Sequence, residues 1–490
     1  MQVFDLTSAA NRNWRRFVLF RVLFNARFYY PVLAVLFLDL GLSATQYTLL
    51  NFAWALAIVA VDLPAGVLAD RIGRRPLVVA AAASMVVEMI LLCVAPLRGG
   101  ATLFLCCLAN RILSGAAEGM ASGADEALVF DSLAVLGREK EWPLVLDQVL
   151  RWQSLGFVVA MLLGGAVYDP ALVNRVFGAH FGQGTTLRFP LYLNLLSAAA
   201  ALVVALGLRE PARRKTSALA GELECDARGP LAHLLAAGGW ILRTPLALFV
   251  IVAGVTLDNV ARLFMTFSSS YFRLIHLPAA SYGFIGAILG GLGLAVSPLA
   301  RRMIARGGPA WNFAWVAAVT LAGLTGVAAR WPVWGVVFTV PVVIAMSAVA
   351  YQVSYYLNAA VDSRQRATVL SFKGMAFNLG FGFVSLGFAG ALRVLRHGSP
   401  EETFGRALPC LPAWLALTAG LLALGFWRSR AFLRRSGGTG TIAGNVADWG
   451  GRRDSNPQQP EPQSGALPLS YDHRAMPPPK SSKVRRDSKR

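Results

Sequence analysis

The chain has 490 residues, of which 56% are hydrophobic and 15% are charged, and its mean hydropathy is +0.53. Soluble domains are typically about 45–50% apolar and about 25% charged, so this composition excludes an ordinary soluble protein. The net charge of +20 would suggest nucleic-acid binding in a soluble chain. Here the basic residues lie between apolar blocks and form no separate basic domain, so we expect no nucleic-acid partner. The five cysteines lack metal-ligand spacing, and we expect neither a metal nor a cofactor.

The apolar blocks have the length of membrane-spanning helices and lack the period-two alternation of barrel strands. They predict an all-α membrane protein, with the bilayer as its solvent and about twelve transmembrane helices in two sets of six. We expect spans near residues 17–38, 46–65, 77–96, 102–124, 147–168, 189–208, 246–268, 281–299, 312–329, 332–357, 367–392 and 408–427.

The polar stretch 209–245 divides the two sets of helices. It predicts an N-terminal six-helix bundle over 1–208, a cytoplasmic linker, and a C-terminal six-helix bundle over 246–435, as in repeat-built transporters. The tail 436–490 is rich in Gly, Ser, Pro, Gln and Arg, and we expect it to be disordered. Its segment Arg452–Arg474 has the look of translated non-coding sequence, so we expect a read-through artefact without function.

Basic residues gather in alternate loops, a pattern that sets the orientation in the membrane. The positive-inside rule predicts that both termini are cytoplasmic, which agrees with an even number of spans. The Ala- and Arg-rich composition suits a bacterium with GC-rich codons, so we expect the bacterial inner membrane. The basic loops carry Arg12, Arg15, Arg16, Arg71, Arg74, Arg75, Arg138, Lys140, Arg209, Arg213, Arg301, Arg302, Arg306, Arg364 and Arg366.

The loop between the second and third spans carries the strongest motif. It reads Gly-Val-Leu-Ala-Asp-Arg-Ile-Gly-Arg-Arg-Pro-Leu-Val over residues 66–78. The glycines permit a tight loop and close helix approach, and an Asp is favourable at a helix N-terminus. A generic basic turn explains the cations but not the ordered Gly, Asp and Gly. The motif residues are Gly66, Asp70, Arg71, Gly73, Arg74 and Arg75.

This loop resembles the signature of the major facilitator superfamily, G-x-L-a-D-r-x-G-r-r, and the resemblance covers roughly residues 12–435. It implies two pseudosymmetric six-helix bundles that rock around a central cavity. It also implies that the loop latches the two halves in the outward-facing state. By this resemblance, Asp70 would face the start of span eleven near Arg366. Arg74 would meet a carboxylate at the cytoplasmic end of span four, for which Asp131 is the first candidate.

Span four carries Arg111, Glu118 and Asp125 at intervals of seven residues, which places them on one helix face. Charges inside a spanning helix are costly, so they are expected to face a wet cavity or paired charges. The segment from Arg111 to Gly115 also resembles the family's R-x-x-x-G pattern, which is associated with proton-coupled transport. An ion pair that fixes helix packing is the alternative. Proton coupling is expected first at Arg111 or Glu118, since Asp125 lies nearer the membrane interface.

Other charges also interrupt apolar runs. Arg27 in span one and Glu88 in span three lie at about the depth of Glu118, so a mid-membrane pair is expected to exchange a proton for a substrate cation. In span seven, Asp258 and Arg262 either neutralise each other at i,i+4 spacing or contact the substrate.

Aromatic residues end span ten. Tyr351 and Tyr355 either line a cavity for aromatic or cationic solutes or anchor the helix at the membrane interface.

Together these features favour a secondary transporter, an antiporter that exports a small amphipathic compound in exchange for protons. The segment from Asp362 to Ser371 resembles a loop of drug-efflux members, although span five lacks the Gly-Pro pair frequent in antiporters. The alternatives are a proton-coupled importer of a polar metabolite and a non-transporting membrane scaffold or receptor. An enzyme is not expected, because the chain has no metal-binding His pair, no G-x-S-x-G elbow and no phosphate loop. The sequence does not determine the oligomeric state.

Overall fold

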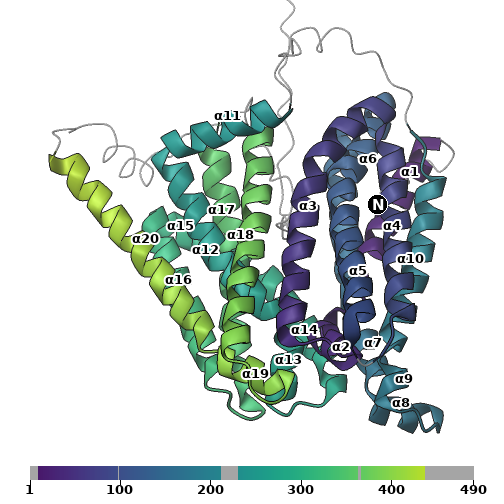
Figure 1. Ribbon diagram of the computed structural model, residues 1–490. Helices are drawn as coiled ribbons and strands as arrows, with labels where there is room; N and C mark the ends of the chain where they lie inside the picture. The colour runs from purple at the N-terminus through teal and green to yellow at the C-terminus, as the bar shows by residue number, and fades with distance from the viewer. Residues whose placement is uncertain (1–8, 98, 211–229, 362–365, 436–490) are drawn as a thin grey trace, which may run out of the picture.

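The computed structural model describes residues 9–97, 99–210, 230–361 and 366–435 (Figure 1). Every regular element among these residues is helical, and none is a strand. Twelve helical segments of this described part are long and apolar enough to cross a bilayer. Helices satisfy their own backbone hydrogen bonds, as the interior of a bilayer requires. The prediction of an all-α membrane protein with about twelve spans is therefore confirmed.

The first bundle is formed by the helices that precede residue 208. Its elements are α1 (Ala9–Asn25), η1 (Tyr30–Val32), α2 (Leu33–Leu40), α3 (Ala44–Ile72), α4 (Arg74–Val94), α5 (Gly100–Ala121), α6 (Ala124–Val135), η2 (Glu139–Glu141), α7 (Trp142–Tyr168), α8 (Pro170–Phe177), α9 (Gln183–Thr186) and α10 (Phe189–Gly207).

The second bundle follows helix α11 (Pro230–Arg243), which lies across one end of it (Figure 1). Its elements are α12 (Pro245–Thr266), α13 (Ser268–Leu274), α14 (Ala279–Ala295), α15 (Ser297–Arg306), α16 (Pro309–Ala328), η3 (Trp334–Phe338), α17 (Thr339–Ala360), α18 (Arg366–Val394), α19 (Pro400–Ala407) and α20 (Cys410–Arg435). Helix α11 was not predicted, because stretch 209–245 was interpreted as a polar linker.

Span one is broken between α1 and η1, where a continuous helix was predicted. The Asn194 side chain accepts a hydrogen bond from the Phe28 backbone N–H at 3.0 Å and holds the irregular segment. Gly164 of α7 packs so closely against the Phe28 carbonyl that a Cβ there would overlap it. Because the backbone leaves the helix here, Arg27 can turn toward the interior of the first bundle.

Span four is broken as well, which corrects the prediction of one charged face. Helix α5 ends at Ala121 and α6 begins at Ala124, and Gly123 adopts φ +71° between them. Glycine enters this left-handed region at little cost, whereas other residues are strained there. Asp125 therefore lies on a different helix from Arg111 and Glu118.

The motif loop between α3 and α4 docks onto the end of α10. The Glu210 carboxylate accepts hydrogen bonds from the backbone N–H groups of Arg74 at 3.1 Å and Arg75 at 2.7 Å. It thereby satisfies free N–H groups at the start of α4, where a negative charge is favourable. Gly73 has φ +98°, and a Cβ there would lie 3.1 Å from the same carboxylate.

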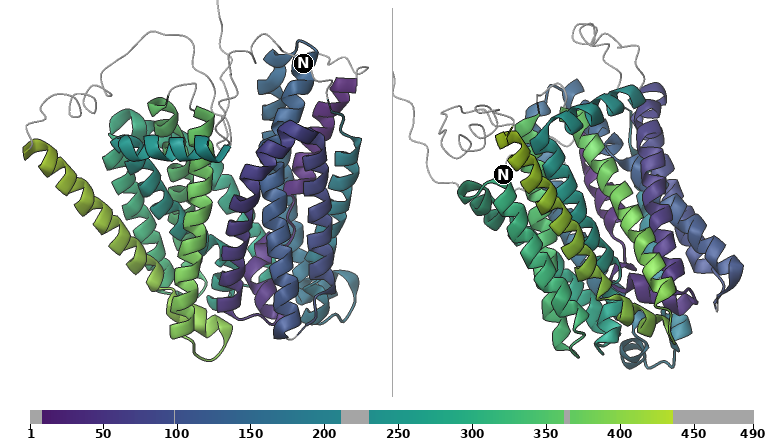
Figure 2. Two further views of the ribbon diagram at one scale, coloured as in Figure 1. Left: turned by 45° about the horizontal axis from the view of Figure 1, so that its top comes forward. Right: turned by 60° about the vertical axis from the view of Figure 1, so that its left-hand side comes forward.

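The two bundles pack against each other through α3 with α18 and α7 with α14 (Figures 1 and 2). Polar contacts reinforce this packing near α2, α12 and α13. The Ser269 hydroxyl accepts hydrogen bonds from the backbone of Ala34 and Val35, and the Tyr47 hydroxyl donates to the Thr266 carbonyl at 2.8 Å. These contacts lie at the end of the molecule opposite the motif loop, which we call the closed end. The opposite end, with the motif loop, α11 and α15, is the basic end.

Candidate functional site

A buried ion pair forms the centre of the candidate site. Arg27, from the break in span one, donates to the Glu88 carboxylate of α4 at 2.5 Å. Both side chains are almost completely buried. Asn110 of α5 donates to the Glu88 backbone carbonyl at 2.9 Å, so three segments of the first bundle meet here. A buried ion pair of this kind is stable only while both partners are present.

Glu118 of α5 is a second carboxylate beside Arg27. Its carboxylate lies 3.8 Å from the second terminal nitrogen of Arg27, and 39% of its side chain is exposed. Arg27 therefore lies between one enclosed carboxylate and one accessible carboxylate.

Arg111 lies on α5 with 5% of its surface exposed. Its guanidinium sits 4.8 Å from the ring centroid of Phe37. Its Nε and one terminal nitrogen are buried without a hydrogen-bond partner among the described residues. Arg111, which was predicted to take part in proton coupling, is thus a buried cation that forms no ion pair within the described part of the chain, although Glu88 lies near it.

The hydrogen bonds and the ion pair of the motif loop, in its described part, are all made within the first bundle. Arg74 forms an ion pair with Asp131 of α6, and it also donates to the Ala127 carbonyl at 2.7 Å. Arg71 is exposed, and a Cβ at Gly66 would have no neighbour within 4 Å.

The Asp70 side chain and residues 362–365 lie outside the described part. Arg366 is the first residue of α18 and is half-buried. Its Nε has no hydrogen-bond partner among the described residues. The latch between Asp70 and Arg366 therefore stays a prediction.

Asp125 lies on α6 and belongs to a different cluster from Glu118. It accepts from Arg21 of α1 at 3.0 Å, and Glu126 accepts from the same guanidinium at 2.9 Å. These contacts tie α1 to α6 within the first bundle.

The second bundle contributes its own charged group. Asp258 pairs with Arg262 at 2.9 Å, and Arg262 also donates to Asn378 of α18 at 3.3 Å. The ammonium of Lys373 lies 5.9 Å from the Phe377 ring centroid. The pairing of Asp258 with Arg262 was predicted from their spacing. The contact of Arg262 with Asn378, and the position of Lys373 over Phe377, were not predicted.

The two tyrosines of span ten lie on the last part of α17. Tyr351 neighbours Arg301 of α15, and the ring of Tyr355 packs edge-on against Tyr356 at 5.4 Å. Tyr356 in turn accepts a hydrogen bond from Asn312 of α16 at 2.6 Å. These contacts place both tyrosines near the basic end of the second bundle.

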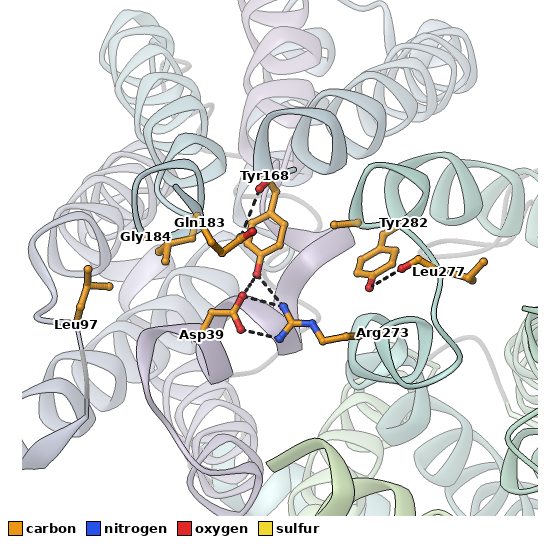
Figure 3. Close-up of a pocket in the computed structure, with 10 residues that line it drawn as sticks. Asp39, Leu97, Tyr168, Gln183, Gly184, Arg273, Leu277 and Tyr282 are labelled. Atoms are coloured by element: carbon orange, nitrogen blue, oxygen red, sulfur yellow. Dashed lines mark hydrogen bonds and ion pairs between the residues drawn. The ribbon is translucent and has the colours of Figure 1, made fainter. Parts of the chain in front are cut away.

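Sequence reasoning missed a polar network between the bundles at the closed end (Figure 3). Arg273 of α13 donates to both oxygens of Asp39 at 2.6 and 2.8 Å, and to Glu401 of α19 at 3.2 Å. The Tyr168 hydroxyl donates to Asp39 and accepts from Arg273 at 3.2 Å. A cavity of about 720 Å³ adjoins these groups and is also lined by Gln183.

This network favours the protonated, positively charged form of Arg273. Burial lowers the pKa of its guanidinium, but the hydrogen bonds and charge of Asp39 outweigh burial and raise that pKa above its usual range. The network joins α2 and α7 of the first bundle to α13 of the second. Its members are far apart in the sequence and end their helices, where a charge is unremarkable, so no local pattern reveals it.

The comparison with protein families is decisive for the fold. The sequence model of one protein family, the Major Facilitator Superfamily, matches residues 17–385 of this chain. The chain belongs to the major facilitator superfamily. It is thus a transporter-family membrane protein that moves a small solute through a helical bundle. A comparison with curated proteins finds no match.

Solved structures of the superfamily share this fold. The nucleoside transporter NupG aligns with TM-score 0.65 at 12% identity, over 86% of this chain and 99% of that one. A bacterial homologue of the human lysosomal transporter Spinster, in an inward-facing conformation, aligns with TM-score 0.64 at 15% identity, over 87% and 98%. A D-xylose–proton symporter aligns with TM-score 0.58 at 14% identity, over 83% and 97%. At these identities the likeness concerns the fold.

Proposed function

We propose that this superfamily member is a proton-coupled secondary transporter in which Glu118 is the proton-exchanging carboxylate. The observation that carries the proposal is the asymmetry around Arg27. One of its carboxylates, Glu88, is fully enclosed, and the other, Glu118, is 39% exposed at 3.8 Å. Ionisable groups inside a membrane bundle are costly and typically mark ion or proton pathways.

The chemistry follows from the charge on Arg27. When Glu118 is ionised, it shares the guanidinium with Glu88 and competes with any other anion for it. When Glu118 takes up a proton, its attraction for Arg27 is lost, while the Glu88 pair still holds the guanidinium in position. Protonation therefore changes what the site binds, and a group with different charge in two states can bias the equilibrium between two conformations.

In alternating access, the site opens first to one side of the membrane and then to the other, so the orientation of the chain determines which side it now faces. The positive-inside rule supports a cytoplasmic position for the basic end and for both termini, in a bacterial plasma membrane. The polar contacts between the bundles lie at the opposite end. We infer that the described conformation opens toward the cytoplasm, and transport requires those contacts to break while the motif loop latches the basic end.

The chemistry of the solute follows from the charged groups. The sequence favoured export of an amphipathic compound, with import of a polar metabolite as the alternative. An amphipathic compound fits a largely apolar cavity. The half-exposed Glu118 and the partly exposed Arg262 support a small polar solute instead. Export stays a prediction, and a measurement of proton flux in liposomes decides the direction of solute transport.

The test uses purified protein in liposomes that contain a pH-sensitive dye, with an imposed solute gradient. Wild type is compared with Glu118→Gln and with Glu139→Gln, a matched change at an exposed residue of η2. We expect solute-driven proton movement in wild type and Glu139→Gln, and its loss in Glu118→Gln. The sign of the pH change distinguishes import with protons from export against them. Proton movement that persists in Glu118→Gln excludes this residue as the coupling group.

A further inference from the structure

The buried part of the first-bundle cluster carries more positive than negative charge. Arg27 and Arg111 are both at least 95% buried, and Glu88 is the one fully buried carboxylate beside them. These three groups sum to a charge of +1. Glu118 restores neutrality when it is ionised, but it contacts Arg27 and not Arg111. A buried charge without a partner is costly, so this arrangement requires an anion at certain stages of the cycle.

The unsatisfied hydrogen-bonding atoms of the cluster are mostly donors. They comprise Nε and a terminal nitrogen of Arg111 and the terminal nitrogen of Arg27 that lies 3.8 Å from Glu118. The unsatisfied acceptors are Oε2 of Glu88 and Oδ1 of Asn110. Two of these three donors belong to one guanidinium, which points to a ligand with several acceptor oxygens.

Arg111 lies nearer the closed end than Glu118 does, on the same helix. The two residues are seven positions apart on the uninterrupted helix α5, so they occupy the same helix face about 10 Å apart. Glu118 is the exposed member, and Arg111 is nearer the closed end.

Aromatic side chains surround the Arg111 guanidinium. The Phe37 ring covers the guanidinium at 4.8 Å, and Tyr29 and Tyr47 are its neighbours. Both tyrosines are almost fully buried. A guanidinium with one face against a ring still presents its edge to a carboxylate, which it binds with two parallel hydrogen bonds.

We propose that Arg111 binds the anionic group of the transported solute, and that this solute is a small organic anion with a carboxylate. The inference rests on the proposed function, whose proton-exchanging residue is Glu118. With Glu118 ionised, the four charged groups sum to zero. With Glu118 protonated, they sum to +1, and a bound monoanion returns the site to neutrality. The proton and the anion are therefore bound together and move in the same direction, and no covalent bond forms or breaks.

This assignment differs from the amphipathic compound that the sequence favoured, and from the aromatic or cationic solute that was one interpretation of span ten. That expectation rested on Tyr351 and Tyr355, which lie near the basic end of the second bundle. The second bundle supplies cations too. Arg262 and Lys373 share the single carboxylate of Asp258, so these three groups of the second bundle also sum to a charge of +1.

The test measures thermal stabilisation of the full chain in detergent, because a ligand that binds the folded state raises its melting temperature. The probes are L-lactate, succinate, L-glutamate and benzoate, with lactamide and benzamide as neutral analogues and choline as a cation. The variants are Arg111→Gln, Arg111→Lys and the exposed control Arg302→Gln. Size-exclusion chromatography checks that each variant folds, and the Lys variant keeps the charge if the Gln variant does not fold.

We expect at least one carboxylate to stabilise wild type and Arg302→Gln, while its amide analogue does not. The apparent affinity for that carboxylate falls about 10- to 100-fold in Arg111→Gln. It falls by less in Arg111→Lys, because lysine keeps the positive charge but cannot form the two parallel hydrogen bonds of a guanidinium. Stabilisation by none of the carboxylates, by the amide equally, or by choline alone overturns the proposal. So does an unchanged carboxylate affinity in Arg111→Gln.

The same carboxylate is then used in the liposome assay, which separates this inference from the proposed function. Anion binding that needs Arg111, without proton movement, supports the binding site and contradicts coupling at Glu118. Proton movement driven only by neutral or cationic solutes supports the coupling and contradicts the anion site.

Discussion

Arg27 shows how a single backbone break positions charged side chains inside a membrane bundle. It leaves the helix between Asn25 and Tyr30 and reaches Glu88 on α4. The sequence revealed both partners, because a charge inside an apolar run is rare and needs a partner. It did not reveal that Glu118 is the exposed member, since exposure depends on how α5 packs against its neighbours.

Removing one partner of the buried pair is expected to destabilise the protein. Glu88→Gln leaves the Arg27 guanidinium enclosed beside a neutral amide, which typically costs about 3–5 kcal/mol. Replacing both residues with apolar ones of similar size, as in Arg27→Met with Glu88→Leu, should recover much of that loss. Thermal unfolding in detergent measures the effect. A Glu88→Gln variant as stable as wild type contradicts the enclosed pair.

Helix packing between the bundles depends on glycines of α7 and α14. Gly283 lies so close to the Met161 carbonyl that a Cβ would overlap it, and Gly165 faces Gly283 from the other helix. The span positions were predictable because they depend on apolar length. The breaks in spans one and four were not, because they depend on tertiary contacts such as the one between Asn194 and Phe28.

A pair of glycines on one helix provides a test at this scale. Gly283→Ala should impair packing of α14 on α7 and lower stability by about 1–3 kcal/mol, since the backbone must move apart. Gly291→Ala, eight residues further along α14, meets nothing within 4 Å and should be neutral or slightly stabilising. Melting temperatures and the amount of folded protein compare the two. Equal effects of both substitutions would show that the close approach at Gly283 is unimportant.

The whole molecule is held in one conformation by contacts at its closed end. Asp39 and Tyr168 of the first bundle share Arg273 of the second, while the described hydrogen bonds and ion pair of the motif loop stay within the first bundle. The resemblance to the superfamily predicted a latch at the basic end, but no motif marked this network. A latch at each end, closed in turn, is what rocking of two bundles requires.

Asp39 should therefore control the balance between the two states. Asp39→Asn removes the charge that joins Arg273 to the first bundle, whereas Glu401→Gln removes a contact within the second bundle. Because the pair is partly exposed, we expect Asp39→Asn to shift the equilibrium by about fivefold toward the state closed at the basic end. Glu401→Gln should leave the equilibrium close to that of wild type.

The most direct measurement is the distance between spin labels on the two bundles at the basic end. Labels at the exposed positions Arg71 and Arg302 in a cysteine-free background report whether that end opens or closes. Alternating access predicts two distance populations, with the shorter one enriched in Asp39→Asn and not in Glu401→Gln. One unchanged distance in all three proteins, with and without a transported solute, would contradict the rocking of the bundles around the Glu118 site.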